Sequence, residues 1–343
     1  MQKKQIRLAD IARALGISTA TVSRALKDYP DISQSTKNKV TALAKELNYR
    51  PNSMAAGLRN SETRIIGVII PEIVNPFFAK VIKGIMEVAY EANYKVMLCQ
   101  SDESFEKEVA DAEALLSSRV DGLLFSVSNA TQQYDHIFEF QHAGSPVVIF
   151  DKTSSELMNF SSVMIDDKKA AMQATEALIH GNCKRIAHIT GPSNAYTFVK
   201  RKEGYLAALQ NNGLQTDESW IRECPVLSHE AGREAAEALM SLPNPPDAIF
   251  AATDLVAIGA IVGVKAKGKR IPEDVSVIGF GDWEVYEAID PPLSCVSQPA
   301  FQMGMMATQI LLDEIQLAKK DKTIEPQHVL LDTSLIQRAS IRV

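Results

Sequence analysis

From residue 64 onward, short apolar runs alternate with longer stretches whose apolar residues follow helical spacing. Runs such as RIIGVII are apolar throughout, which is typical of strands buried on both faces of a sheet. This alternation predicts an α/β fold in which helices cover parallel sheets on both sides. The predicted helices include 76–93, 167–180 and 254–268, and the predicted strands are 64–70, 94–100, 120–126, 146–151, 162–167, 185–190, 247–254, 275–282 and 293–298. Nine strands are too many for one compact sheet in a chain of this length, so we expect two lobes.

The bulk properties are those of a globular protein with more than one domain. The chain has 343 residues, of which 46% are hydrophobic and 23% charged. No apolar run approaches the roughly 18 residues that span a membrane, and the first residues lack the apolar segment of a secretory signal. Four scattered cysteines without metal-ligand spacing fit a reducing compartment. We therefore expect a cytoplasmic protein without a membrane partner.

Charge is distributed unevenly along the chain. Residues 1–60 hold eleven Lys/Arg and four Asp/Glu, a net charge of +7. Because the whole chain carries −6, the remainder carries −13. A basic segment attached to an acidic body is typical of a nucleic-acid-binding unit joined to a second function. Only this basic segment is a plausible surface for DNA.

The basic segment has the spacing of three short helices. Apolar residues share one helical face in 8–15, and Gly16 then supplies the positive φ of a tight helix exit. Ser18 or Thr19 is placed to cap a second helix. A third helix is predicted within 33–49, with lysines on its outer face. This arrangement predicts a helix-turn-helix unit, although a small helical bundle with a merely solvated polar face has the same spacing.

The stretches LADIARALGISTATVSRAL and LNYRPNSMAAGL resemble the DNA-binding headpiece of the LacI family of bacterial transcription regulators. The resemblance implies a headpiece over residues 1–50 that binds double-stranded operator DNA. It places Thr19 and Ala20 against base edges, and Arg24 against either a guanine or a phosphate. It assigns phosphate contacts to Ser23, Thr36, Lys37 and Tyr49.

Residues 51–63 are predicted to be a hinge between the headpiece and the rest of the chain. A helix from about Asn52 to Leu58 is too short to be stable alone in water. In the family this segment becomes ordered when two copies pair on the minor groove. The resemblance therefore places Asn52, Ala55 and Leu58 at DNA, with Leu58 as an apolar wedge between base pairs. The alternative is a disordered linker.

The order of strands and helices from 64 to 343 resembles the type I periplasmic-binding-protein fold, the effector core of the same family. GVIIP, VDGLLF, PVVIFD, RIAHITG and DVSVIGFGD are among the matching segments. The resemblance implies three crossings between lobes, near 161–163, 291–293 and 322–325. The N-lobe is expected over about 64–161 and 293–322, and the C-lobe over about 163–291 and 324–340. An effector then binds between the lobes, at the carboxyl ends of the strands.

The residues that match the family's ligand contacts favour a sugar or sugar derivative. Apolar rings and charged groups suit the faces and hydroxyls of such a molecule. The expected contacts are Phe77, Phe78, Asp151, Arg201, Thr253, Asp254, Asp282 and Trp283. The sequence departs from the family pattern twice: Thr253 stands where the family has Asn, and GFGDW replaces GFDD or GFDN. Gly281 thus removes a carboxylate, and Trp283 either stacks on a sugar ring or packs against the edge of the lobe.

The sequence thus predicts a repressor of a carbohydrate-utilisation operon that a sugar-like effector controls. No leucine heptads follow LLDTSLIQRAS, so we expect a homodimer on a pseudo-palindromic operator rather than a tetramer. No cofactor or metal is expected. A dehydrogenase is disfavoured because no GxGxxG follows a strand, and a transport protein because no signal segment is seen. The remaining alternative is a sugar-binding protein without selective DNA binding.

Overall fold

The computed structural model describes residues 6–49 and 62–342. Internal contacts divide the chain into two units, residues 1–63 and residues 64–343, and each is described by itself. The predicted hinge residues Asn52, Ala55 and Leu58 lie outside the described residues.

The N-terminal unit contains three described helices, as the apolar spacing predicts: α1 (Leu8–Leu15), α2 (Thr19–Leu26) and α3 (Gln34–Glu46). Gly16 ends α1 with a φ of 63°, and the Ser18 hydroxyl caps α2 by accepting a hydrogen bond from the Thr21 N–H at 3.0 Å. One small apolar core holds the helices together, formed by Ile11, Ala12, Val22, Ala25, Val40 and Ala44.

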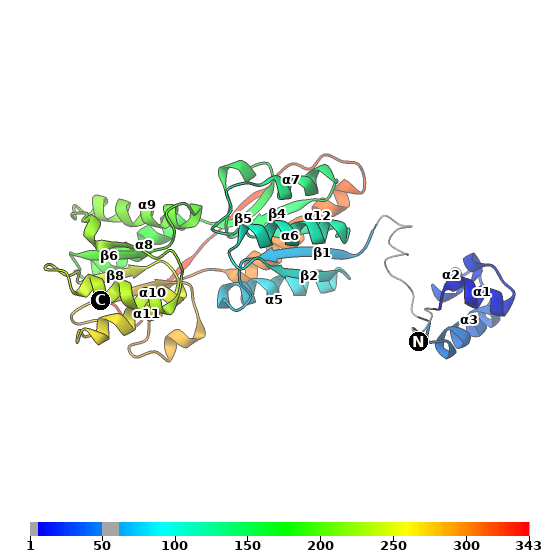
Figure 1. Ribbon diagram of the computed structural model, residues 1–343, viewed down its shortest axis with the longest axis horizontal. Coiled ribbons are helices and arrows are strands. Elements are labelled where there is room, and N and C mark those ends of the chain that lie inside the picture. Colours follow the sequence, from blue (N-terminus) through cyan, green and yellow to red (C-terminus); the bar gives the residue numbers. More distant parts are fainter. Residues whose placement is uncertain (1–5, 50–61, 343) are drawn as a thin grey trace. The chain divides into compact units, whose positions relative to one another are not determined.

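The core unit is an α/β structure with two six-stranded sheets, which confirms the predicted fold class (Figure 1). The sheet of the first lobe has the order β11-β5-β4-β3-β1-β2, and all its neighbouring strands are parallel. Its strands are β1 (Ile65–Ile70), β2 (Lys95–Gln100), β3 (Gly122–Phe125), β4 (Val147–Phe150), β5 (Ser161–Ile165) and β11 (His328–Leu331). One face is covered by α5 (Pro76–Glu91) and α12 (Ala300–Ala318), and the other by α6 (Phe105–Ser117) and α7 (Asp135–His142).

The sheet of the second lobe has the order β12-β10-β9-β8-β6-β7. Only β12 runs antiparallel to its neighbour. The strands are β6 (Ile186–Thr190), β7 (Ile221–Glu223), β8 (Ala248–Ala251), β9 (Ser276–Phe280), β10 (Ser294–Ser297) and β12 (Ser334–Ile336). The faces are covered by α8 (Asp167–His180) with α9 (Tyr196–Asn211), and by α10 (His229–Met240) with α11 (Asp254–Ala266).

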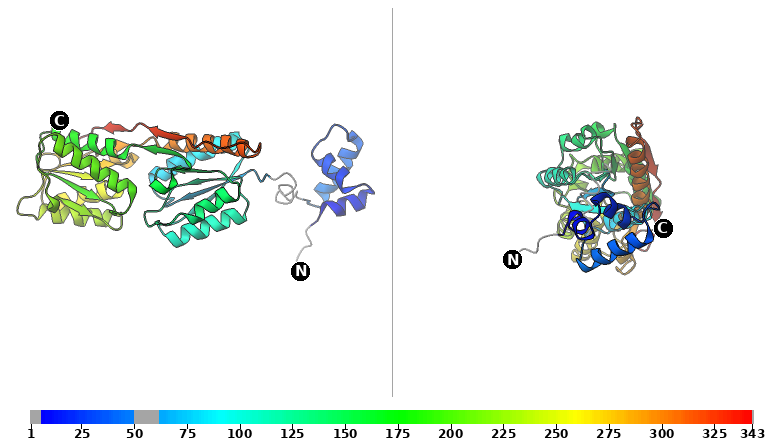
Figure 2. Two further views of the ribbon diagram at one scale, coloured as in Figure 1. Left: turned by 90° about the horizontal axis from the view of Figure 1, so that it is seen from above. Right: turned by 90° about the vertical axis from the view of Figure 1, so that its right-hand side faces the viewer.

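The chain changes lobe three times, each time later than the sequence predicts. Strand β5 belongs wholly to the first lobe, so the first crossing follows Ile165 rather than residues 161–163. Strand β10 belongs to the second lobe, so the second crossing follows Ser297 rather than 291–293. The third crossing lies between β11 and β12 rather than at 322–325 (Figure 2). The predicted lobe limits are therefore wrong because each crossing strand completes its own sheet before the chain leaves.

No helix in the described part of the chain combines the length and the apolar character needed to cross a membrane.

Candidate functional site

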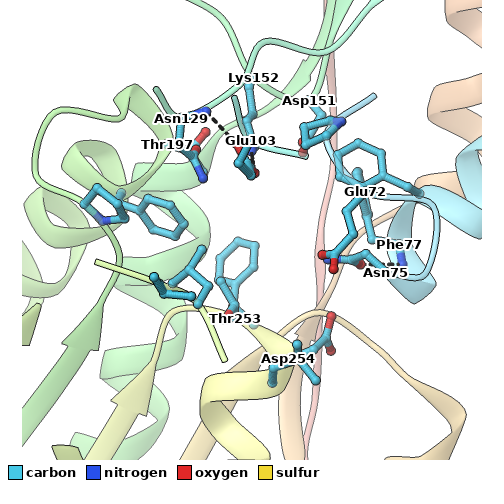
Figure 3. A pocket seen from close by; sticks show the side chains of 18 of the residues that line it. Glu72, Asn75, Phe77, Glu103, Asn129, Asp151, Lys152, Thr197, Thr253 and Asp254 are labelled. Carbon is cyan, nitrogen blue, oxygen red and sulfur yellow. Dashed lines mark hydrogen bonds and ion pairs between the residues drawn. The ribbon is translucent and has the colours of Figure 1, made fainter. Parts of the chain in front are cut away.

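A cavity of about 780 Å³ lies between the two lobes of the core. Its lining residues follow the carboxyl ends of strands from both sheets: Pro71 follows β1, Asp151 follows β4 and Thr253 follows β8 (Figure 3). In an open parallel sheet, loops at this edge are the usual place for a ligand. Of the eight predicted effector contacts, six line the cavity: Phe77, Phe78, Asp151, Arg201, Thr253 and Asp254.

Arg201 on α9 lines the cavity from the second lobe, and its side chain is held in place by several contacts. Its Nε donates to the Asp167 carboxylate at 2.8 Å, and its Nη1 donates to the Ala252 carbonyl at 2.6 Å. Its guanidinium also lies 3.5 Å from the centre of the Phe280 ring. The side chains of Arg201 and Asp167 are both almost fully buried, so their opposite charges compensate each other away from water. Arg201 therefore presents a preorganised donor fork to the cavity.

Asp254 begins α11 and accepts a hydrogen bond from the Tyr286 hydroxyl at 2.6 Å. Burial raises the pKa of Asp254 to about 6. The neighbouring Gly281 has a φ of 116°, and a Cβ built there would lie 2.2 Å from Asp254 Oδ2. Asp254 thus fills the space that a side chain at 281 would need. The glycine that departs from the family pattern makes room for this carboxylate.

Asp151 directly follows β4 and has a φ of 64°, a backbone conformation that only a few non-glycine residues adopt. Burial raises its pKa to about 7, with Lys152 and Arg201 acting in the opposite direction. Strained, buried carboxyls in a cleft are typical of functional sites. This position supports the predicted role of Asp151 toward a ligand.

Aromatic rings line the cavity on both lobes. Phe77 and Phe78 contact each other edge to face at 5.1 Å on the first lobe. Phe198 and Phe280 line it from the second lobe, and neither was predicted from the sequence. Phe280 is the last residue of the observed strand β9 but lies two residues before the end of the predicted strand 275–282, so the sequence did not mark it as a strand end. Nothing in the local pattern distinguishes Phe198 within α9.

Four buried polar atoms at the cavity have no partner among the described residues. They are Asn129 Oδ1, Thr197 Oγ1, Thr253 Oγ1 and Gln298 Nε2. A buried polar group without a partner costs about 1–3 kcal/mol, which a ligand or water recovers by bonding to it. Apart from Thr253, these residues were not predicted.

Two predicted effector contacts, Asp282 and Trp283, do not line the cavity. The Asp282 carboxylate turns away and accepts hydrogen bonds from Ser297 Oγ at 3.2 Å and Arg338 Nη2 at 3.3 Å. Trp283 packs against the apolar core of the second lobe, which is the second of its two predicted roles. Arg338 comes from the far end of the sequence, so local pattern does not reveal its pairing with Asp282.

In the N-terminal unit, Thr19 and Ala20 begin α2 and are exposed. Ser23 is half-buried one turn further on. Arg24 is half-exposed, pairs with the Asp31 carboxylate, and lies 5.6 Å from the centre of the Tyr29 ring. The exposed start of α2 is therefore free to meet a partner, whereas Arg24 has to leave Asp31 to do so.

The phosphate-contact candidates gather around the start and end of α3. Thr36 bonds with its side chain to the Ser33 cap, and Lys37 Nζ lies 2.7 Å from the Asp28 carboxylate. Tyr49 packs against the small apolar core, and burial raises its pKa. All three are half-buried. The structure thus places every described DNA-contact candidate in one small unit.

Within residues 6–49 and 62–342, no group of three or more His, Cys, Asp or Glu is placed to hold a metal ion.

A cleft between two parallel-sheet lobes, joined in one chain to a basic three-helix unit, defines a class of protein: a ligand-responsive regulator with its own nucleic-acid-binding unit. Residues 7–52 match the family described as bacterial regulatory proteins, lacI family. Residues 63–339 match the periplasmic binding proteins and sugar-binding domain of the LacI family. The chain belongs to the LacI family, as its sequence predicts. Its relatives are regulators and not enzymes.

Similar proteins cover the whole chain. The transcriptional repressor CytR of Escherichia coli strain K12 is 34% identical over 99% of this chain and 98% of its own. Catabolite control protein A of Priestia megaterium is 34% identical over 93% of this chain and 95% of its own. Among solved structures, a complex of the transcriptional regulator CelR with cellobiose has a TM-score of 0.74 at 29% identity, covering 98% of this chain and 99% of that chain.

Proposed function

We propose that this protein is a repressor of carbohydrate-utilisation genes that binds operator DNA as a homodimer and releases it when a sugar-like effector fills the cleft. The cleft carries this proposal, because it combines a preorganised arginine, buried carboxylates, aromatic rings and unpartnered polar atoms. Relatives that are DNA-binding repressors, and one regulator in complex with cellobiose, support it. Since its target is chromosomal DNA, the protein acts in the cytoplasm.

The charges around the cleft favour a neutral polyhydroxylated effector. Six carboxyl groups and two cationic side chains line the cavity, and burial raises the pKa of two of the carboxyls, Asp151 and Asp254. An excess of carboxylates repels phosphorylated sugars and accepts hydrogen bonds from neighbouring hydroxyls. Phe77 lines the cavity from the first lobe, and Phe198 and Phe280 line it from the second; their rings supply apolar surface for the faces of a sugar ring. A neutral sugar thus satisfies both kinds of lining.

On DNA, the exposed start of α2 reads bases. Thr19 and Ala20 contact base edges, and Arg24 exchanges Asp31 for a guanine or a phosphate. Ser23, Thr36, Lys37 and Tyr49 contact phosphates, which position the unit without reading sequence. In the hinge, Asn52, Ala55 and Leu58 act in the minor groove.

The effector acts by shifting the balance between two arrangements of the lobes. One contact between the lobes is a hydrogen bond from Lys80 Nζ on α5 to the Asp282 carbonyl at 2.8 Å. A ligand that touches both lobes favours the arrangement that fits it, and the difference in its affinity for the two arrangements sets the size of the response.

The proposal is tested by selecting duplexes from a random pool with the full-length protein and then adding neutral sugars. We expect enrichment of a pseudo-palindrome and its release by a sugar, with Arg201→Met retaining the DNA but not responding. Enrichment of no sequence, together with thermal stabilisation by a sugar, would instead establish a sugar-binding protein without selective DNA binding.

A further inference from the structure

A second cavity of about 270 Å³ adjoins the cleft. The two cavities share Asn129, Lys152, Asn194 and Thr197 among their lining residues, so they adjoin along a common wall that these residues form. We call the smaller cavity the side chamber. Its volume is close to the lower end of the range for small-molecule sites, about 300 Å³. The side chamber therefore offers room for one further unit of a ligand that already occupies the cleft.

The common wall carries two polar atoms that lack partners. Thr197 is 5% exposed, and its Oγ1 has no hydrogen-bond partner among the described residues. Asn129 Oδ1 is likewise buried and unpartnered within that part of the chain. Figure 3 shows these side chains at the same rim of the cavity, next to Lys152 and Glu103. Asn129 Oδ1 needs a donor, and Thr197 Oγ1 can donate or accept, so a hydroxyl-bearing ligand satisfies both.

Two carboxylates, one half-buried and one fully buried, hold the wall in position. Glu103 accepts hydrogen bonds from the Asn129 N–H and from Lys152 Nζ, both at 2.6 Å. The fully buried Glu108 accepts from the Ser128 N–H and from Thr131 Oγ1, both at 2.7 Å. The loop between β3 and α7 is thus held through its middle, at residues 128–131. A rigid wall of this kind is a property of a built binding site.

The charges at the side chamber decide which kind of ligand unit fits it. Among the described residues that line it there is no carboxylate, and its two lysines are already paired. Lys152 is bonded to Glu103, and Lys200 Nζ lies 3.0 Å from both oxygens of Glu203. Because the charge of each lysine is already compensated, a phosphate or carboxylate group of a ligand would find no unpaired cation to bind in the side chamber. Most of the remaining lining residues are Ser, Thr or Tyr, whose side chains combine a hydroxyl with apolar carbon atoms.

We propose that the effector is a neutral molecule of at least two linked hydroxyl-bearing rings, with one ring in the cleft and the second in the side chamber. This inference rests on the proposed function, since it assigns the size and charge of the same effector. It makes Thr197 and Asn129 determinants of specificity at the junction of the two rings.

The test is isothermal titration of the full-length protein with neutral disaccharides, their component monosaccharides and the corresponding 6-phosphates. We expect the best disaccharide to bind at least 10-fold more tightly than either component, and the phosphates to bind more weakly still. Val199 lines the side chamber and is 37% exposed, so Val199→Trp fills the chamber from its open side. In that variant the advantage of the disaccharide over the monosaccharide should disappear.

Val262→Trp is the matched control, because Val262 is 40% exposed on α11 and does not line either cavity. Thermal unfolding without sugar verifies that both variants are folded. A monosaccharide that binds as tightly as any disaccharide, a tighter 6-phosphate, or a disaccharide preference that survives Val199→Trp would overturn the inference alone. Absence of binding by every sugar tested would overturn the proposed function together with it.

Discussion

Replacing Gly281 by alanine should damage both the stability of the second lobe and the effector site. The added Cβ would lie 2.2 Å from Asp254 Oδ2 and 2.4 Å from Asp254 Cγ, far inside van der Waals contact. Gly281 also has a φ of 116°, where an L-residue is strained by about 1–3 kcal/mol. Relief of the clash moves the Asp254 carboxylate away from the Tyr286 hydroxyl, which costs about 1–3 kcal/mol for the buried groups.

Together these terms predict a loss of about 2–6 kcal/mol, and hence a decrease in Tm of at least about 4 °C. Effector affinity should decrease at least about 10-fold, which corresponds to about 1.4 kcal/mol, because Asp254 lines the cleft. The measurements are thermal unfolding without ligand and isothermal titration with the effector.

Gly213→Ala is the control, because Gly213 has a φ of 66° but no atom lies within 4 Å of the position that its added Cβ would occupy. It should show only backbone strain of about 1–2 kcal/mol and unchanged effector binding. In an Asp254→Ala background the clash is absent, so Gly281→Ala should become less costly by at least about 1 kcal/mol. If Gly281→Ala matched Gly213→Ala in Tm and in affinity, the steric reasoning would be refuted.

Three further changes probe other parts of the molecule. Arg201→Met should lower stability by about 3–5 kcal/mol, because it leaves a buried carboxylate unpaired, and should abolish release of operator by effector, measured by unfolding and anisotropy. Asp31→Asn should raise operator affinity about 3–10-fold at low salt because it frees Arg24, whereas Glu46→Gln, with the same change of charge, should have a smaller effect. Burial raises the pKa of Asp151 from 3.8 to about 7, so its stabilising contribution is complete at low pH and is lost as pH rises through 7. The Tm of Asp151→Asn minus the Tm of the wild type should therefore increase as pH rises from about 4 to about 8. A difference in Tm that stays constant over this range would contradict this prediction.

The sequence predicts the N-terminal unit almost to the residue because its signals are local. Gly16 and Ser18 act on their own helices, and the apolar spacing of each helix points to one small core. The buried central strand β1 is equally clear, since it is a continuous apolar run. Strand β11 was not predicted because it alternates exposed and buried residues at a sheet edge, and its place depends on pairing with β5.

The site is predictable only in part, because several of its features join residues far apart in the chain. Asp151 and Asp254 follow apolar strands, and the resemblance places them correctly at the cleft. The Asp282 carboxylate does not line the cleft and instead accepts a hydrogen bond from Arg338, a contact that spans 56 positions. That Phe198 and Thr197 line a cavity is recognised only from the position of α9 in the folded chain, not from the local sequence.

The central claim is that one chain couples selective DNA binding to a neutral sugar in the cleft. It is tested most directly by fluorescence anisotropy with short pseudo-palindromic duplexes that have a central CG step, at two salt concentrations, with and without a mixture of neutral sugars. We predict tight, sequence-selective and salt-sensitive binding that the sugars weaken. Equal binding to every duplex, or selective binding that no sugar alters while a sugar still raises the Tm of the protein, would contradict that coupling.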